Sequence, residues 1–576
     1  MSQTIGEALV DQLVQAGVER IYGVVGDSLN PITDAIRRNG KIRWIAVRHE
    51  ETGAFAAGAE AQLQDRLAAC AGSCGPGNLH LINGLFDAHR SMAPVLGIAA
   101  QIPSGEIGTG YFQETHPDRL FQECSHYCEL ISQPKQMPRT LQIAMQQAQS
   151  RGGVSVVVIP GDIAAQPMPE GNLSHPLILE SPAIRPHEAA VAQLADMLNE
   201  AKKVTIFAGS GCKNAHGELL TLAETLKAPI GHALRGKQYV EYENPYDIGM
   251  SGLIGGRAAY DAMHACDMLL LLGTDFPYSA FMPDNVKIAQ VDIRAEHLGR
   301  RSKLDLGLWG DVRETIHALM PMLKSKSDRS HLDTALQSYE DTRHKWNAYV
   351  KRPGKKGAIH PEFVADVLNE LTNDDAIFTA DTGMCTVWAS RYIRAKRERR
   401  IIGSFMHGSM ANAMPQAIGA QMLYPQRQVV AICGDGGFSM LMGDVLTLLQ
   451  YNLPIKLILF NNNALDMVKL EMQSSGYPDY ETDYKNPDFA KMAEAIGFMG
   501  VHVEDPADVR GGLQRILKHS GPALIDIITD PHALSMPPRV NTDQFKGFAL
   551  AMGKMMLADR AGEVADIVEA NVFNVL

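Results

Sequence analysis

Residues 429–463 read VVAICGDGGFSMLMGDVLTLLQYNLPIKLILFNNN, and the fold prediction starts from this stretch. A short apolar run before a glycine turn predicts a buried strand, and a second such run follows a helix-length segment. A strand–helix–strand unit of this kind closes right-handed and makes its two strands parallel. Asp435 and Asn462 then leave the carboxyl ends of neighbouring strands, where open α/β sheets bind their ligands.

The side chains at these two strand ends suit a hard cation. One carboxylate and one amide oxygen are ligands that Mg²⁺ accepts. The neighbouring Gly436 and Gly437 would let backbone N–H groups and a helix N-terminus approach a diphosphate held by that cation. A lone Gly-Asp-Gly is commonly a turn and Asn-Asn a polar loop, so the prediction depends on their occurring together at this spacing.

Length, charge and cysteine usage exclude several classes of protein. A chain of 576 residues predicts about three domains. Its net charge of −12 and lack of a basic face argue against nucleic acid as a partner. We find no apolar run long enough to span a bilayer and no signal peptide, so we expect a cytoplasmic protein. The eight cysteines are expected to be reduced, with the Cys70/Cys74 and Cys124/Cys128 pairs explained by packing.

Alternating apolar strands and helical segments predict an α/β protein with three doubly wound parallel-sheet domains and a short helical tail. The expected boundaries are 1–180, 187–335, 345–530 and 531–576. Prolines at 165–186 mark an extended linker between the first two domains. In the tail we expect two short amphipathic helices. A helix docked on its own protein is the commoner explanation, since three basic and four acidic residues follow Phe545 and membrane-surface helices are usually basic.

Two further features remain open on spacing alone. Glu50 follows a predicted strand at 42–47 and begins an alanine-rich helix, where a carboxylate is favoured by the helix dipole without any other role. In the middle domain Gly209-Ser210-Gly211 lacks the third glycine of a dinucleotide fingerprint, since Asn214 stands there. Several glycine-rich strand exits would still form a groove for an extended cofactor. The exits hold Leu234, Arg235, Ser251, Gly252, Leu253, Ile254, Thr274, Asp275, Phe276, Pro277, Tyr278 and Asp292.

Five motifs occur together in this chain: Arg48-His49-Glu50, Gly75-Pro76-Gly77, Gly408-Ser409-Met410, Gly434-Asp435-Gly436 and Asn462. The set resembles the thiamine-diphosphate enzymes of the pyruvate oxidase and acetolactate synthase group. The resemblance covers the whole chain. Strings such as AGSCGPGNLHLINGLFDAHR, GSFMHGSMANAMPQAIGAQ and CGDGGFSMLMGD are most similar to the quinone-dependent pyruvate oxidases of bacteria.

The resemblance implies a pyrimidine-binding, an FAD-binding and a diphosphate-binding domain, in that order. Asp435, Asn462 and the backbone carbonyl of Ala464 would hold Mg²⁺ on thiamine diphosphate. Glu50, supplied by a partner subunit, would hydrogen-bond the aminopyrimidine ring, and Met410 would bend the cofactor. The middle-domain groove would hold FAD. The other implied thiamine-site residues are Gly408, Ser409, Gly436, Gly437, Asn463, Leu465, Asp466, Met467 and Val468, with Gln113 and Glu471 joining Glu50 as catalytic residues.

The implied reaction is oxidative decarboxylation of pyruvate to acetate and CO₂, with electrons passing through FAD to a membrane quinone. A homo-oligomer, expected to be a tetramer, would bind a lipid surface through its tail at the inner face of the cell membrane. The alternatives are acetolactate synthase-type carboligation, a phosphate- and oxygen-dependent pyruvate oxidase, and an inactive paralogue serving as a scaffold. The chain departs from the quinone-dependent pattern at Asp466, Met467 and Thr382, where a glycine, an aromatic residue and a valine are expected.

Overall fold

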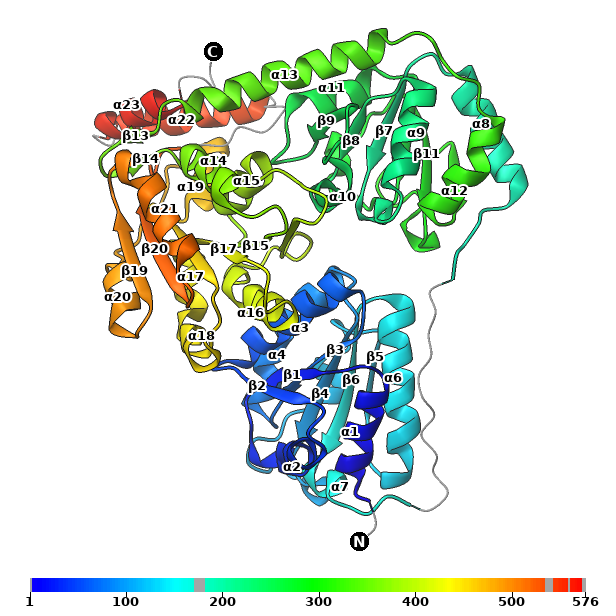
Figure 1. Cartoon of the computed structure of the whole chain (residues 1–576), viewed down its shortest axis with the longest axis vertical. Helices are drawn as coiled ribbons and strands as arrows, with labels where there is room; N and C mark the ends of the chain where they lie inside the picture. Colours follow the sequence, from blue (N-terminus) through cyan, green and yellow to red (C-terminus); the bar gives the residue numbers. More distant parts are fainter. Residues whose placement is uncertain (1–2, 170–181, 534–541, 558–559, 572–576) are drawn as a thin grey trace.

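The computed structural model describes residues 3–169, 182–533, 542–557 and 560–571. They form three six-stranded parallel sheets with helices on both faces, which confirms the predicted fold class. The first domain lies below the other two in Figure 1, and the middle and third domains lie side by side above it. Part of the predicted linker and the end of the predicted helical tail, residues 572–576, lie outside the described residues.

The first sheet has the strand order β2-β1-β3-β4-β6-β5. Its strands are β1 (Arg20–Gly23), β2 (Arg43–Ala46), β3 (Ala68–Gly72), β4 (Val95–Gln101), β5 (Tyr127–Leu130) and β6 (Val154–Pro160). One face packs on α3 (Glu50–Gln64) and α4 (Pro76–Arg90). The other packs on α1 (Ile5–Gln15), α2 (Asn30–Asn39), α6 (Met137–Arg151) and α7 (Gly161–Ala164), while α5 (Pro117–Leu120) precedes β5.

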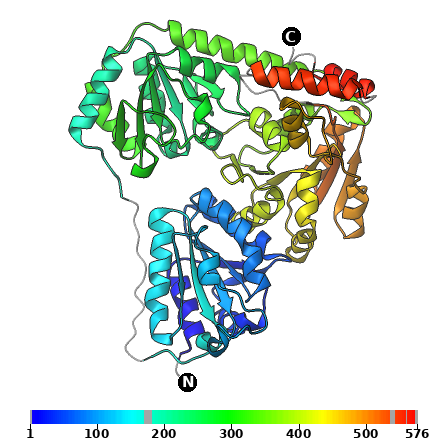
Figure 2. The same ribbon diagram turned by 180° about the vertical axis from the view of Figure 1, so that it is seen from behind.

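The middle sheet has the order β12-β11-β10-β7-β8-β9, which is the 3-2-1-4-5-6 arrangement of dinucleotide-binding folds. Its strands are β7 (Val204–Ala208), β8 (Ile230–His232), β9 (Asp247–Met250), β10 (Met268–Leu272), β11 (Lys287–Asp292) and β12 (Leu306–Trp309). The helices are α8 (Glu188–Glu200), α9 (His216–Leu226), α10 (Lys237–Val240), α11 (Arg257–Ala265) and α12 (Val312–Leu319). The long α13 (Ser330–Val350) runs from this domain toward the third, as both ribbon views show (Figures 1 and 2).

The third sheet, β16-β15-β17-β18-β20-β19, repeats the strand order of the first. Its strands are β15 (Ile377–Ala380), β16 (Arg400–Gly403), β17 (Val429–Gly434), β18 (Lys456–Asn461), β19 (Met499–Val503) and β20 (Ala523–Ile528). Its helices are α14 (Pro361–Leu371), α15 (Met384–Tyr392), α16 (Ala413–Leu423), α17 (Asp435–Leu441), α18 (Val445–Tyr451), α19 (Asp466–Ser474), α20 (Phe489–Ala495) and α21 (Val509–Lys518). A short antiparallel pair, β13 (Gly354–Lys355) and β14 (Ala358–Ile359), precedes α14.

The stretch at 429–463 forms the predicted unit with one difference. β17 and β18 pair in parallel, with Gly434 opposite Phe460. The expected single helix between them is broken into α17 and α18 by a 3₁₀ turn at Met442–Asp444. Gly443 lies at the centre of this turn, and glycine weakens a helix interior.

One apolar core joins the first and third domains. Alanines of α3 and α4 pack with Ala417, Ile418 and other residues of α16, and the same cluster continues to β17 and β18. Gly419 makes this approach close, since a Cβ there would lie 2.1 Å from the Ala56 carbonyl oxygen. The site regions of these two domains are therefore held in fixed relation to each other.

The tail packs on α19 as α22 (Thr542–Leu557) and α23 (Ala561–Ala570). Met552, Met555 and Ile567 are buried there, with Leu470 of α19 packed against them. This contact supports the docked-helix explanation of the amphipathic pattern. Among the described helices, none is both long and apolar enough to cross a bilayer.

Candidate active site

A cavity of about 80 Å³ lies where β15, β17 and β18 end. β15 and β17 are hydrogen-bonded neighbours at the point where the strand order of the sheet reverses, which is where open α/β sheets bind ligands. All described residues that line this third-domain cavity lie between 361 and 530. The predicted residues among them are Thr382, Met410, Asp435, Gly436, Gly437, Asn462, Ala464, Leu465, Asp466, Met467 and Val468.

Asp435 is the first residue of α17 and is 2 % exposed. Burial raises the pKa of its carboxyl to about 6, and a hydrogen bond from the Asn486 amide, 2.6 Å from Oδ2, opposes this rise. The backbone N–H groups of Gly436 and Asn463 also lower the pKa. A buried carboxylate surrounded by neutral donors is suited to a cation, which would supply the missing positive charge.

Gly437 allows α17 to begin close to the end of β15. A Cβ at this position would lie 2.5 Å from Asp381 Oδ2, closer than side-chain contacts permit. Burial raises the pKa of Asp381 to about 7, and its Oδ2 has no hydrogen-bond partner among the described residues. Glycine at 437 is therefore required by packing as well as by the predicted approach of a diphosphate.

Glu50 lies in the first domain, at the start of α3 and 7 % exposed. Its Oε2 is 2.9 Å from Nδ1 of His80, and a Cβ at Gly77 would lie 3.1 Å from Oε1. Gln113 lies beside the same turn, where its Oε1 is 3.4 Å from Cys74 Sγ. The structure thus brings Glu50, the glycine turn and Gln113 together, and it adds His80, which carried no motif.

The motif at 408–410 connects the Glu50 region of the first domain with the third-domain cavity. Asn83 of α4 donates from Nδ2 to Glu51 Oε1 at 2.7 Å and to Ser409 Oγ at 2.8 Å. Met410 follows directly and lines the third-domain cavity, whereas Gly408 is exposed with a φ of 78°. Glu50 itself does not line that cavity, so within one chain the two predicted halves of the site are separate.

A second, larger groove of about 440 Å³ lies at the reversal of strand order between β7 and β10. Of the predicted exit residues, Leu234, Arg235, Ser251, Ile254, Thr274, Asp275, Phe276, Pro277, Tyr278 and Asp292 line it. Among the described residues Gly252 and Leu253 do not line it: Gly252 packs under Phe276, and Leu253 is 39 % exposed. This middle-domain groove also takes His89 and Arg90 from the first domain and Phe405 and Met406 from the third.

Gly209-Ser210-Gly211 lines the same groove despite its incomplete fingerprint. A Cβ at Gly209 would lie 2.3 Å from the Gly273 carbonyl oxygen, so the two strand exits approach through their backbones. The Ser251 hydroxyl oxygen is buried without a hydrogen-bond partner in the described part of the chain. An unpaired buried hydroxyl at the groove indicates a polar ligand that would complete it.

Three domain families match the sequence. The N-terminal TPP binding domain of thiamine pyrophosphate enzymes matches residues 3–120, the central domain 191–319, and the C-terminal TPP binding domain 381–527. The chain belongs to the thiamine pyrophosphate enzyme family. Its two TPP binding domains contain the Glu50 turn and most of the residues that line the third-domain cavity, respectively.

Individual relatives agree with this membership. The chain is 34% identical over 568 residues to a putative thiamine pyrophosphate-containing protein, YdaP, of Bacillus subtilis, covering 98% of each chain. It is 30% identical over 540 residues to a pyruvate oxidase of Lactiplantibacillus plantarum, covering 91% of this chain and 88% of the relative. It is also 30% identical over 565 residues to an acetolactate synthase of Mycobacterium bovis, covering 93% and 89%.

The donor sets fit the cofactors expected for a thiamine pyrophosphate enzyme. The third-domain cavity offers a buried carboxylate, the Asn462 amide and the carbonyl of Ala464, all of which are hard oxygen donors. The middle-domain groove has the strand order and backbone approach of a dinucleotide site. The roles of the individual residues stay predictions.

Asp466 and Glu471, two predicted site residues on α19, lie in very different surroundings. Asp466 is 5 % exposed at the first position of the helix, and its Oδ1 has no hydrogen-bond partner among the described residues. Burial raises its pKa to about 8, which the nearby Lys469 ammonium opposes. Glu471, the predicted catalytic residue, is exposed and lies outside the described lining of the cavity.

Several lining residues carried no sequence signal as site residues. Cys385 and Trp388 of α15 line the third-domain cavity, as do Thr529 and Asp530 after β20. The segments that carry these four residues bear no recognisable motif. Their position at the carboxyl end of the sheet was the only signal that could have identified them.

Proposed function

We propose that the protein oxidatively decarboxylates pyruvate to acetate and CO₂ and passes the electrons through FAD to a membrane quinone. The main support is the middle-domain groove, which is built like a dinucleotide site and extends to Phe405 and Met406. These residues lie a few positions before Met410 of the third-domain cavity. A flavin in the groove would therefore lie near a thiamine cofactor.

Each group of residues has a defined task in this proposal. Asp435, Asn462 and the Ala464 carbonyl would hold Mg²⁺, and the N-terminus of α17 would receive the diphosphate. Thiamine diphosphate, when bound, supplies a nucleophilic carbon and an electron sink for decarboxylation. Glu50 would exchange a proton with the aminopyrimidine ring, and the apolar Met410 would set the bend of the cofactor.

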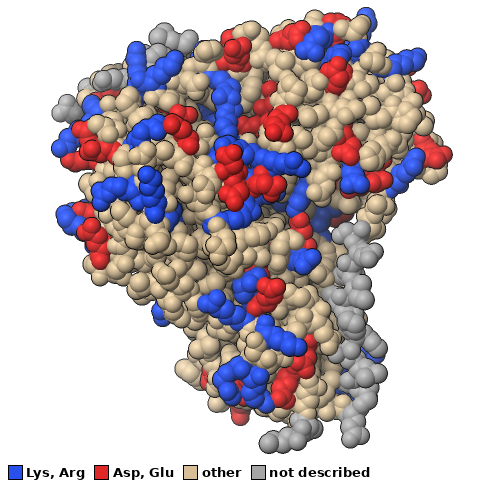
Figure 3. All heavy atoms as spheres, in the orientation of Figure 1, with Lys and Arg blue, Asp and Glu red and all other residues tan. Residues whose placement is uncertain are grey.

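A partner subunit would complete the site. Glu50 and Asp435 belong to separate regions of one chain, so a shared site needs the Glu50 region of a second copy. A surface for that copy is present on α17, α18 and the turn between them, where Met440, Met442, Leu446 and Leu449 are all exposed. Figure 3 shows few charged side chains over this area, while charges of both signs alternate elsewhere on the visible face. We propose a homo-oligomer, with a tetramer as the expected form.

The tail is proposed to bind a lipid surface at the inner face of the membrane. Its exposed Leu550, Met556, Leu557 and Val568 offer apolar contacts on the outside of the docked helices. Deleting residues 550–576 is expected to remove activation by liposomes while sparing turnover with a soluble acceptor. Equal activation of the truncated protein would limit the tail to a structural role.

Anaerobic mixing with pyruvate, followed through the flavin absorbance, tests the reaction. Bleaching on pyruvate and recovery on adding a quinone are expected. Bleaching that only oxygen and phosphate reverse would favour the phosphate- and oxygen-dependent oxidase. Formation of acetolactate without bleaching would favour carboligation. Absence of any turnover with intact cofactor binding would favour the inactive paralogue.

A further inference from the structure

The side chain of Asn486 forms a hydrogen-bonded connection between the third-domain cavity and the end of β18. Its Nδ2 lies 2.6 Å from Asp435 Oδ2 and 3.1 Å from Asn461 Oδ1. An amide nitrogen carries two hydrogens, so both bonds are made by one group. The reversed amide would point its oxygen at the Asp435 carboxylate, and repulsion therefore fixes the orientation.

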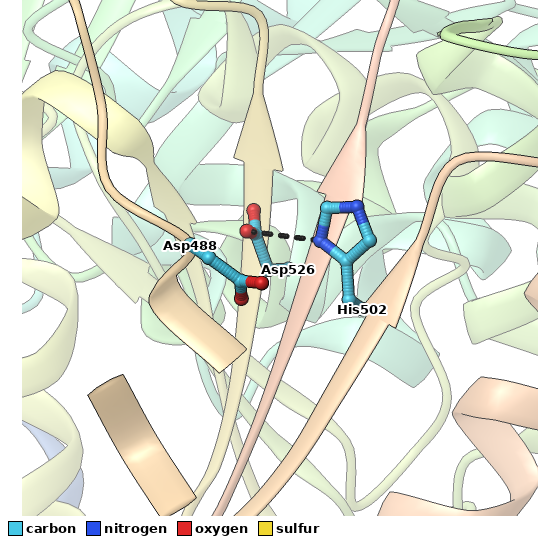
Figure 4. Close-up of side chains that lie close together, drawn as sticks. All are labelled: Asp488, His502 and Asp526. Carbon is cyan, nitrogen blue, oxygen red and sulfur yellow. Dashed lines mark hydrogen bonds and ion pairs between the residues drawn. The ribbon is translucent and has the colours of Figure 1, made fainter. Parts of the chain in front are cut away.

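Asn461 continues the connection to Asp526 of β20. The Asn461 Nδ2 donates to Asp526 Oδ1 at 2.9 Å. The other carboxylate oxygen accepts from the backbone N–H of Phe489 at 3.3 Å and lies 3.4 Å from Nδ1 of His502 (Figure 4). Asp526 is 1 % exposed, so the hydrogen-bonded connection from Asp435 ends at a buried carboxylate, which we call the anchor.

The group formed by Asp488, His502 and Asp526 is better explained as an anchor than as a metal site. Their ligand-type atoms lie within 4.8 Å of one another. Figure 4 shows the three side chains close together. However, Asp488 accepts from the Lys491 backbone N–H at 2.9 Å, and its other oxygen pairs with the Lys491 ammonium at 2.9 Å. Both oxygens of Asp526 are engaged as well, so each carboxylate is already satisfied by protein groups.

The segment that carries Asn486 is fastened to the loop that carries the predicted cation ligands. Leu465 donates its N–H to the Thr482 carbonyl at 2.7 Å, and Tyr484 donates to the Asn463 carbonyl at 2.6 Å. Ala464 and Asp483 form an antiparallel bridge between these two bonds. The loop after β18, the segment at 482–486 and the start of α17 are therefore one connected unit.

We propose that Asn486 is a positioning residue of the cation site, and that Asn461 and Asp526 hold its amide in place. The inference rests on the proposed function, because it assumes that Asp435 binds the cation. Outer-shell partners that orient a ligand usually change metal affinity about 10- to 100-fold when they are lost. Asn486 lies well outside the recognised motif, yet it bonds the carboxylate that the motif provides.

The test uses the full chain stripped of cofactor and titrates Mg²⁺ at saturating thiamine diphosphate, with binding followed by calorimetry. Asn486→Ala should raise the half-saturating Mg²⁺ concentration about 10- to 100-fold. Asp526→Asn, which conserves volume, should shift it in the same direction. Asn373→Ala, at an exposed position beside the same sheet, is the matched control and should leave binding unchanged.

A second readout separates positioning from general loss of structure. A carboxylate that is free to rotate should accept Ca²⁺ more readily, since Ca²⁺ tolerates flexible geometry and Mg²⁺ does not. The preference for Mg²⁺ over Ca²⁺ should therefore fall in Asn486→Ala and stay unchanged in the control. If Asn486→Ala does not fold, Asp526→Asn and Asn486→Ser carry the same measurement.

The outcomes distinguish this inference from the function on which it rests. Wild-type protein that binds thiamine diphosphate without any requirement for Mg²⁺ would overturn the cation site and the inference together. Mg²⁺-dependent binding in the wild type, with unchanged affinity and ion preference in the folded variants, would overturn the inference alone. A shift in affinity together with a lower preference for Mg²⁺ would support it.

Discussion

Lys469 and Glu563 form an ion pair, with 3.1 Å between Nζ and Oε1, that joins α19 to the C-terminal α23. Lys469 is 5 % exposed, and a nearly buried ammonium needs such a partner. Arg560 adds a bond to Asp479 at 2.8 Å in the same contact. The tail is thereby attached to the helix whose first residues, Asp466 to Val468, line the third-domain cavity.

Lys469→Met should loosen the tail from α19. The change removes the ammonium that faces Glu563 but keeps an unbranched apolar stem of similar length. Limited proteolysis is expected to release the tail faster in the variant while the three domains stay resistant. Lys491→Met, at an exposed lysine of α20, is the control. Equal cleavage rates in wild type and Lys469→Met would show that the ion pair does not hold the tail.

Glu50→Gln tests the proton-exchanging role proposed for Glu50. The amide keeps the size of the side chain near His80 but cannot accept or release a proton at this position. Flavin bleaching by pyruvate should slow by about 10²- to 10⁴-fold, with FAD still bound. Glu129→Gln, at an exposed glutamate of β5, should behave as the wild type. Bleaching at the wild-type rate in Glu50→Gln would remove Glu50 from the mechanism.

Gly437→Ala should damage the third-domain cavity. The added methyl group would lie 2.5 Å from Asp381 Oδ2, and overpacking of this kind costs about 1–3 kcal/mol. Weaker thiamine diphosphate binding and a lower thermal midpoint are expected. Gly511→Ala, at an exposed position of α21, is the matched control, because a Cβ there meets no atom within 4 Å. Similar behaviour of the two variants would contradict the packing argument.

Asp87 predicts a pH dependence of stability. Its carboxyl is buried between α4 and α16, accepts from Gln416 at 3.0 Å, and has its pKa raised by burial from 3.8 to about 6. Between these values the folded protein retains a proton that the unfolded chain has released, so stability falls as the pH rises. The rise in the Asp87 pKa from 3.8 to about 6 corresponds to a change of at most about 3 kcal/mol in the free energy of unfolding.

Asp87→Asn removes this titration. Its thermal midpoint relative to the wild type should rise between about pH 4 and pH 6 and then level off. Asp341→Asn, at an exposed aspartate of α13, should show no such trend. A midpoint difference that does not vary with pH would mean that Asp87 is not the group responsible.

The sequence predicted the buried centre of each sheet better than its edges. The central strands β7 and β10 are buried at every residue and are nearly continuous apolar runs, which is the pattern that predicts a strand in a parallel sheet. The edge strands β5 and β12 are only partly buried and show no such run, so the sequence does not mark them as strands. Gly252 and Leu253 were predicted for the groove but are not among its described lining residues, because the position of a loop residue depends on packing that local sequence does not specify.

In the thiamine site too, some residues could be predicted from the sequence and others could not. Asp435, Asn462 and Met410 could be identified because their chemistry is tied to short motifs next to strand ends. His80 and Asn486 could not, because each meets its partner only through the packing of separate segments, 30 and 51 residues apart in sequence. Glu471 shows the reverse case: the resemblance named it, and the structure leaves it exposed.

The apolar core shared by α3, α4, α16 and β17 has a consequence for unfolding. The first and third domains cannot separate without exposing this core, so they should melt as one cooperative unit even though the middle domain lies between them in the chain. The middle domain has its own core around β7 and β10 and can melt independently. On heating, the first and third domains should therefore unfold together and the middle domain separately, although the middle domain lies between them in the chain.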